Sequence, residues 1–230
     1  MNKTLLELRR SEVRLLVLSD IHGAEEKIPM LKNEASAAQA VIVAGDLTHF
    51  GAVEDVRRIL DALRSFELPL YAVAGNCDSP EIERFLAEEG VALGREARYL
   101  ERFAVYGVSG ALPGPVDTPY ETTEEGLEEL LQSIDTPPDR PLILVVHQPP
   151  YKTVGDRVMR FKHVGSRAVR RWIERHQPRL VVSGHIHESF GTETLGPSRL
   201  LNPGAFRDGR YAVVDVDPES GEVGVELKKI

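Results

Sequence analysis

Short apolar runs that each end in a polar residue recur along the chain and predict buried strands. They occupy residues 13–18, 40–44, 70–74, 142–146 and 180–182. The runs are rich in Val, Ile and Leu and do not alternate with polar residues, which is typical of strands covered on both faces. The pattern therefore predicts a sheet that lies inside the molecule.

Segments with helical periodicity lie between these runs. Residues 53–65 carry apolar side chains at helical spacing, and the Ser-Pro pair at 79–80 suits the start of a second helix. Ser166 suits the N-cap of a third helix, which would end before Pro178. The alternation of strands and helices indicates βαβ units and a largely parallel sheet.

The C-terminal part follows a different pattern. From residue 189 onward, short strand-like segments are separated by Gly-Pro-Ser, Asp-Gly and Pro-Glu-Ser-Gly turns, which predict hairpins. Residues 98–108 predict two further strands, and the Pro-rich stretch 110–119 predicts a surface loop. We expect the C-terminal strands to form a second, more antiparallel sheet packed on the first.

Composition restricts the class of protein. The chain has 230 residues, 42% of them hydrophobic, so we expect one domain over residues 1–230. The net charge of −8 argues against nucleic-acid binding, and the single cysteine favours a reducing compartment. The N-terminus has no apolar signal-peptide core, and no run approaches the roughly 18 apolar residues of a membrane helix. We therefore expect a cytoplasmic protein without a membrane partner, and homo-oligomerisation stays open.

The polar residues that follow the predicted strands are of metal-binding types. They are Asp20, Asp46, Asn76, His147 and His185. In an open α/β sheet, ligands sit beyond the carboxyl ends of the strands, so the fold would bring these side chains together. Imidazole nitrogens and carboxylate oxygens bind divalent metals, and a carboxylate can bridge two of them.

Two short motifs add a second potential ligand to a strand end. They are Asp20-x-His22 and His185-x-His187. Alone, each motif is weak, because Asp-x-His arises by chance and a single buried histidine such as His147 is more often structural. Together they carry more weight, because four of the seven histidines belong to this one set.

The order of the motifs resembles the calcineurin-like metallophosphoesterase family. In chain order the motifs are Asp20-x-His22, Gly45-Asp46, Gly75-Asn76-Cys77-Asp78, His147 and Gly184-His185-Ile186-His187. The resemblance covers nearly the whole chain. It implies a four-layer α/β/β/α sandwich, with two mixed sheets flanked by helices, and a hydrolase that uses two divalent metal ions.

The resemblance also implies a ligand set and a mechanism. The first ion would be held by Asp20, His22, Asp46 and His187. The second would be held by Asp46, Asn76, His147 and His185, with Asp46 bridging. We expect manganese, with iron, nickel, cobalt or zinc as alternatives. The implied mechanism is in-line attack by metal-activated hydroxide without a covalent enzyme intermediate.

One position departs from the family pattern. The third motif usually reads Gly-Asn-His-Asp, whereas this chain has Cys77 at the histidine position, as in a branch of small bacterial and archaeal phosphodiesterases. A thiol is mostly neutral at pH 7 and binds phosphate poorly. Two divalent cations, two aspartates and one hydroxide sum to about +1, which suits a phosphodiester monoanion. We therefore expect a phosphodiesterase with a small phosphodiester or nucleotide-like substrate.

Further residues are candidates for direct roles in the reaction. The candidate catalytic residues are Asn76, Cys77, Asp78 and His163. The candidate substrate contacts are His49, Asn76, Cys77 and His163. Structural readings stay open for two of them, because Cys77 could simply fill a turn and Asp78 could simply cap it.

The segment 151–165 contains His163 and four Lys or Arg side chains in an otherwise acidic protein. By connectivity it begins beside His147, so we expect a flap that attracts the substrate anion. A solvated surface loop without a role in the reaction is the alternative.

Other functions remain open on the sequence alone. A phosphomonoesterase, including a protein phosphatase, is disfavoured by Cys77, and a non-catalytic metal-binding scaffold of the same fold is disfavoured by the complete ligand set. A DNA-repair nuclease is disfavoured because the chain is short and acidic. A cysteine-dependent phosphatase would need Cys-x5-Arg, but that spacing ends on Glu83.

Overall fold

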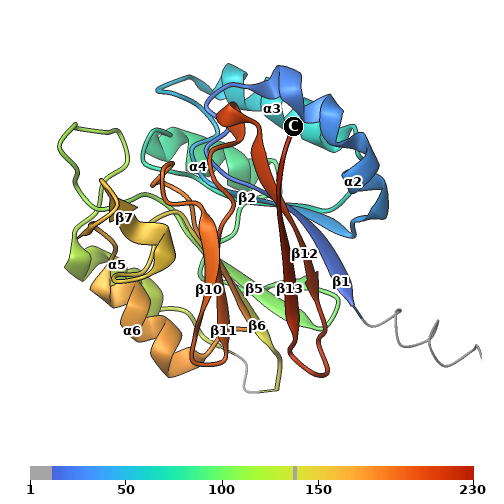
Figure 1. Ribbon diagram of the computed structural model, residues 1–230. Helices are drawn as coiled ribbons and strands as arrows, with labels where there is room; N and C mark the ends of the chain where they lie inside the picture. Colours follow the sequence, from blue (N-terminus) through green and yellow to red (C-terminus); the bar gives the residue numbers. More distant parts are fainter. Residues whose placement is uncertain (1–11, 137–138) are drawn as a thin grey trace, which may run out of the picture.

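The computed structural model describes residues 12–136 and 139–230, and it has the expected four-layer architecture. Two β-sheets lie face to face, and helices cover the outer face of each (Figure 1). The α/β/β/α sandwich predicted from the sequence is confirmed. The expectation that the N-terminus has no apolar signal-peptide core rests on residues 1–11. These residues lie outside the described part of the chain.

The first sheet has five strands. Its spatial order is β13 (Val223–Lys229), β12 (Arg210–Val216), β1 (Val13–Leu18), β2 (Ala40–Ala44) and β3 (Leu70–Val73). Strands β1, β2 and β3 are parallel, whereas β12 runs antiparallel to β1 and β13 antiparallel to β12. The helices on this side are η1 (Glu25–Leu31), α2 (Lys32–Ala37), α3 (Val53–Arg64) and α4 (Pro80–Glu88).

The second sheet has six strands. Its spatial order is β10 (Gly191–Leu195), β11 (Ser198–Asn202), β9 (Leu180–Val182), β6 (Leu142–Val146), β5 (Phe103–Val108) and β4 (Arg98–Leu100). The inner four strands are parallel, and both edge strands are antiparallel to their neighbours. The helices that cover it are α5 (Glu124–Gln132) and α6 (Arg167–His176). Across residues 12–136 and 139–230, no helix is both long and apolar enough to span a membrane.

The C-terminal hairpins do not form a sheet of their own, which corrects the expectation from the sequence. The β10–β11 hairpin extends the second sheet beside β9, whereas the β12–β13 hairpin extends the first sheet beside β1. Each hairpin pairs with the free N–H and C=O groups along an open sheet edge. A further hairpin, β7 (Arg157–Val158) with β8 (Lys162–His163), lies in the segment expected to be a flap.

The side chains of each inner strand enter two different apolar layers. In β1, Leu15 and Val17 belong to the core between the sheets, whereas Leu16 and Leu18 belong to the core under the helices of the first sheet. A third core lies between the second sheet and the helices α5 and α6. Both faces of these strands are therefore buried, which explains why their sequences are continuously apolar.

Core packing between the two sheets should dominate stability. Phe103 of β5 is fully buried in that core, whereas Phe161 is 78% exposed. We expect Phe103→Ala to lower the free energy of unfolding by about 3–5 kcal/mol, because it leaves a cavity between the sheets. The matched change Phe161→Ala should alter it by less than about 0.5 kcal/mol. Urea unfolding followed by circular dichroism measures both, and equal losses would contradict this view of the core.

Candidate metal centre

The loops that follow the strands of both sheets converge on one place. Asp20 follows β1, Asp46 follows β2 and Asn76 follows β3, while His147 follows β6 and His185 follows β9. One link between the two sheets is the backbone N–H of His185, which donates to Oδ1 of Asp20 at 3.1 Å. The structure thus gathers side chains that are far apart in the sequence.

The first group of donor atoms comes from Asp20, His22, Asp46 and His187. One ligand atom from each lies within 4.8 Å of the others. Nε2 of His187 lies 3.1 Å from Nε2 of His22 and 3.2 Å from Oδ1 of Asp20. Within residues 12–136 and 139–230, no Lys or Arg forms an ion pair with Asp20 or Asp46. Buried carboxylates that face histidines in this way fit a bound cation.

The second group is built around Asn76. Its side-chain Oδ1 lies 3.0 Å from Nε2 of His147 and 2.7 Å from Nδ1 of His185. Oδ1 of Asp46 lies 3.4 Å from the same Nε2 of His147. Two imidazole nitrogens, an amide oxygen and a carboxylate oxygen therefore meet, a donor set that suits a divalent transition metal.

Asp46 belongs to both groups. Its Oδ2 lies 3.7 Å from Nε2 of His22, while its Oδ1 faces His147 and accepts the backbone N–H of Cys77 at 2.8 Å. Burial would raise the pKa of Asp46, but His147 and His22 together lower it below its usual range. The side chain is therefore a carboxylate with one oxygen directed toward each group.

Backbone carbonyl groups orient two of the histidines. Nδ1 of His22 lies 3.1 Å from the carbonyl oxygen of Thr48, and Nδ1 of His147 lies 2.7 Å from that of Ala44. An Nδ1–H that donates to a carbonyl leaves Nε2 as the ligand atom, an arrangement that is common around metal-binding histidines. In both residues it is Nε2 that points at Asp46.

Burial lowers the pKa of two of these histidines. It lowers the pKa of His22, and together with the neighbouring His147 it lowers the pKa of His185 to about 4. Both rings are therefore neutral near pH 7, the form that binds a metal. Burial also lowers the pKa of His147, but the Asp46 carboxylate outweighs it and raises that pKa to about 9.

The backbone is left-handed at four of the candidate ligands. The φ angles are 53° at Asp20, 47° at His22, 49° at Asp46 and 70° at His185. Such a conformation costs residues other than glycine roughly 1–2 kcal/mol each, and it concentrates at functional sites. The loops are also closely packed here, because a Cβ on Gly184 would overlap Ser19.

Asp78 joins two of the ligand-bearing loops. Its fully buried carboxylate accepts the backbone N–H groups of Leu47, Thr48 and Gly75, at 2.9–3.0 Å. Burial and the Asp46 carboxylate raise the pKa of Asp78 to about 6. These bonds hold the loop of Asp46 against the loop after β3, and a direct catalytic role for Asp78 stays a prediction.

Cys77 and His49 both lie at the edge of the first group. Together with His22 they place one donor atom each within 4.8 Å of one another. His49 is exposed, and its ring centroid lies 5.4 Å from that of His22. Burial and the Asp46 carboxylate raise the pKa of the Cys77 thiol, which disfavours its nucleophilic thiolate form. Their roles toward substrate stay predictions.

His163 lies outside the immediate ligand cluster. In the described part of the chain, its Nδ1 lies 2.6 Å from Oδ1 of Asp156 and its ring packs against Tyr151, while none of the seven candidate ligands forms a hydrogen bond with it. Sequence reasoning missed Asp156, because a lone aspartate in a loop carries no motif. It also missed Arg207, whose charge contributes to lowering the pKa of His22 after burial and the neighbouring His187.

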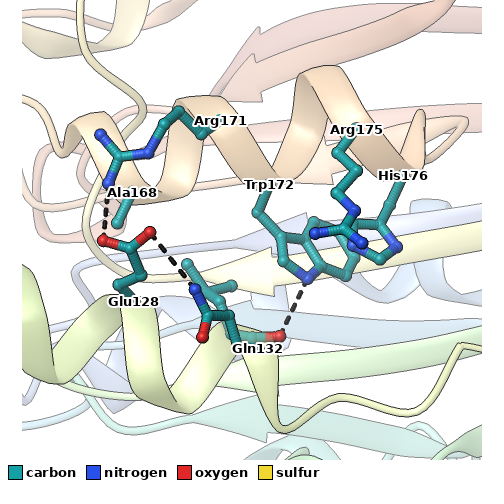
Figure 2. A pocket seen from close by; sticks show the side chains of 8 residues that line it. Glu128, Gln132, Ala168, Arg171, Trp172, Arg175 and His176 are labelled. Atoms are coloured by element: carbon teal, nitrogen blue, oxygen red, sulfur yellow. Dashed lines mark hydrogen bonds and ion pairs between the residues drawn. The ribbon is translucent and has the colours of Figure 1, made fainter.

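A cavity of about 530 Å³ lies elsewhere, between α5 and α6 (Figure 2). The residues that line it are Glu128, Leu131, Gln132, Ala168, Arg171, Trp172, Arg175 and His176. The indole N–H of Trp172 donates to the carbonyl of Leu131, and Arg171 pairs with Glu128. Of the described residues that form this cavity, none belongs to the candidate ligand set.

Comparison with known proteins agrees with this geometry. The family model described as calcineurin-like phosphoesterase matches residues 13–189. An uncharacterised protein of Methanocaldococcus jannaschii is 31% identical over 195 residues, which cover 83% of this chain and 88% of that protein. A Synechococcus protein named a probable cyclic nucleotide phosphodiesterase is 25% identical over 155 residues, which cover 65% of this chain and 58% of that protein.

Solved structures share the fold. A Thermus thermophilus protein superposes with a TM-score of 0.74 at 23% identity, over 93% of this chain and 98% of its own. A purple acid phosphatase from yellow lupin seeds superposes with a TM-score of 0.57 at 10% identity, over 95% of this chain and 52% of its own. With the family match covering most of the chain, these observations lead to one conclusion: the chain belongs to the calcineurin-like phosphoesterase family.

Proposed function

We propose that this chain is a phosphodiesterase that hydrolyses small phosphodiesters at a two-metal centre. The observation that carries the proposal is Cys77, a buried thiol beside Asn76 at the position where an imidazole would otherwise face the substrate. A thiol adds no positive charge for a second anionic oxygen. The site is therefore better matched to the single charge of a phosphodiester than to a phosphomonoester dianion.

The seven converging side chains are the proposed metal ligands. Asp20, His22, Asp46 and His187 would hold one ion, and Asp46, Asn76, His147 and His185 the other. Manganese is the ion we propose, and the same donors also suit iron, cobalt, nickel or zinc. When bound, the ions would polarise the phosphoryl group and lower the pKa of the attacking water.

The protein's own residues would position the reaction. Asp46 keeps the two donor groups at a set separation, and Asp78 braces its loop against the loop of Asn76. His49 is exposed beside the first group and is proposed to contact the substrate. Asn76 belongs to the second group and the adjacent Cys77 lies at the edge of the first, and we propose that both face the phosphoryl oxygens.

The charge of the surroundings supports a monoanionic substrate. Two divalent ions, the carboxylates of Asp20 and Asp46 and one hydroxide sum to about +1. Arg207 is the cation near His22, and its guanidinium lies 3.9 Å from the carboxylate of Asp208, which partly offsets its charge. The name of the Synechococcus relative, a probable cyclic nucleotide phosphodiesterase, points in the same direction.

A phosphomonoesterase is the second candidate function, because Arg207 could bind a second anionic oxygen. A metal-binding scaffold without activity is the third, and the complete set of converging donors argues against it. We further propose a cytoplasmic protein whose substrate is small and nucleotide-like, without nucleic-acid or membrane partners.

Asp46→Asn should remove metal and activity together. The change weakens an oxygen donor that serves both groups, so we expect affinity for each ion to fall at least about tenfold. Metal content after equilibration with Mn²⁺ and desalting measures this, with roughly two ions expected in the parent protein. Asp61→Asn, an exposed change on α3, is the matched control and should keep both ions. Full metal content in the Asp46 variant would exclude the bridging role.

The manganese-loaded protein should prefer diesters. We expect a higher kcat/KM for bis(p-nitrophenyl) phosphate than for p-nitrophenyl phosphate, because the site offers little charge for the second anionic oxygen of the monoester. Steady-state release of nitrophenolate measures both substrates. A higher kcat/KM for the monoester would overturn the preference while leaving the phosphoesterase assignment intact.

Cys77→His should shift the preference toward the monoester. The added imidazole can supply a charged hydrogen bond of about 1.5–3 kcal/mol to the extra anionic oxygen, which corresponds to a rise of roughly tenfold or more in the ratio of monoester to diester kcat/KM. The ratio is measured with the same pair of nitrophenyl substrates and at equal metal content. An unchanged ratio would show that Cys77 does not determine substrate charge.

A further inference from the structure

The segment 151–165, which we call the flap, packs on loops that carry candidate histidine ligands. Gln148, the residue after His147, donates its side-chain N–H to the carbonyl of Val164 at 3.1 Å. Gly155 lies against Ser183, two residues before His185, so closely that a Cβ added there would be 3.6 Å from the Ser183 hydroxyl oxygen. The flap thus contacts both the start of its own loop, beside His147, and the loop after β9.

The same loop after β9 also holds the β7–β8 hairpin of the flap. The backbone N–H of Arg157 donates to the hydroxyl of Ser189 at 3.0 Å, and that of Met159 donates to the carboxylate of Glu188 at 2.8 Å. Glu188 and Ser189 directly follow His187. Because the flap continues the loop of His147 and touches the loop that carries His185 and His187, it lies at the rim of the candidate metal centre.

A buried carboxylate organises the flap from within. Asp156 has no exposed surface, and its oxygens accept the backbone N–H groups of Lys152, Thr153 and Gly165 at 2.9–3.0 Å. A fourth contact, at 2.6 Å, joins its Oδ1 to Nδ1 of His163. Asp156 therefore closes the loop through three backbone donors and also holds the His163 ring.

The contact with Asp156 sets the orientation of the His163 ring. When Nδ1–H donates to a carboxylate, the other ring nitrogen is left to exchange a proton elsewhere. The His163 side chain is 26% exposed, so part of the ring is open to solvent. The charged or titratable groups around it are Arg157 across the hairpin, Lys162 beside it and Tyr151 against the ring, with Asp156 as the carboxylate partner.

We propose that His163 protonates the leaving oxygen of the phosphodiester through Nε2, and that buried Asp156 is the residue that positions it. This inference rests on the function proposed above. The resemblance implies a histidine at the position of Cys77, and its absence leaves the role of proton donor to the leaving oxygen open. The Asp156–His163 pair is the histidine–carboxylate pair that the structure places at the rim of the site.

The proton balance of the step is simple. The oxygen of a water molecule forms the new P–O bond, and the P–O bond to the leaving alcohol breaks. The leaving oxygen takes the proton from Nε2 of His163, which then becomes neutral. The ring keeps its Nδ1–H, which still donates to Asp156. Water returns the proton to Nε2 before the next cycle, and the proton of the attacking water goes to solvent, so no further reactant is needed.

A series of leaving groups tests the proposal. The substrates are methyl aryl phosphodiesters from p-nitrophenyl to unsubstituted phenyl, measured with manganese-loaded full-length protein. A phenoxide leaving group needs the proton more than nitrophenoxide does. We expect His163→Gln to lower kcat/KM about 100-fold or more for the phenyl ester but less than about threefold for the nitrophenyl ester. Glutamine keeps an N–H donor for Asp156, which protects the conformation of the flap.

A second variant and an NMR spectrum distinguish proton transfer by His163 from a purely structural role. Asp156→Asn should also make kcat/KM depend more steeply on the leaving group, because the His163 ring loses its orientation. In the metal-free protein labelled with ¹⁵N-histidine, we expect a downfield Nδ1–H signal that disappears in both variants. His176→Gln is the matched control, because His176 lines the cavity between α5 and α6 and stacks on Trp172 (Figure 2). The His176→Gln variant should change neither the dependence of kcat/KM on the leaving group nor the Nδ1–H signal.

The outcomes are distinguishable. An equal loss of kcat/KM across the series in His163→Gln would show a structural role and overturn the proposal, as would no loss at all. Absence of the Nδ1–H signal from the parent protein would overturn the positioning role of Asp156. If the parent protein hydrolyses neither ester with any of the five metals, the proposed function itself is wrong, and the inference fails with it.

Discussion

Both carboxylate oxygens of Asp46 are used, each toward a different group of histidines, and the candidate centre depends on this arrangement. One oxygen faces His22 from the first sheet and the other faces His147 from the second. Two groups of donors can share one carboxylate only if the ends of β2 and β6 meet. The packing of two sheets face to face is what brings those ends together, so the core between the sheets and the candidate centre form one system.

The proximity of the loops around Asp46 is accompanied by backbone strain. Four candidate ligands have positive φ angles, a conformation that side chains other than glycine adopt at a cost. Asp78 offsets part of that cost, because its buried carboxylate bonds to backbone N–H groups of two ligand-bearing loops. Strain of this kind persists when the surrounding contacts fix a conformation more strongly than local preference does. The contacts of Asp78 therefore help to fix the conformation of the loops that carry the candidate ligands.

A second buried aspartate plays a comparable role at the rim. Asp156 closes the flap through backbone N–H groups, much as Asp78 joins the loops beneath. The flap continues the loop that begins at His147 and touches the loop that carries His185 and His187, and its hairpin is hydrogen-bonded to the residues that follow His187. The flap that holds His163 thus packs beside the candidate metal centre, even though the ring makes no hydrogen bond with the candidate ligands among the described residues.

The sequence by itself determined the inner strands and the residues that end them. A strand covered on both faces must be continuously apolar, and the side chains that end β1, β2, β3, β6 and β9 are of the few types that bind metals. Only the tertiary structure decided which sheet edge each C-terminal hairpin joins, and that Asp156 pairs with His163. The physical reason is that open edges accept any strand with suitable backbone groups, and that a hydrogen bond within a loop depends on its three-dimensional path. Neither property produces a pattern of apolar and polar residues that can be recognised in the sequence.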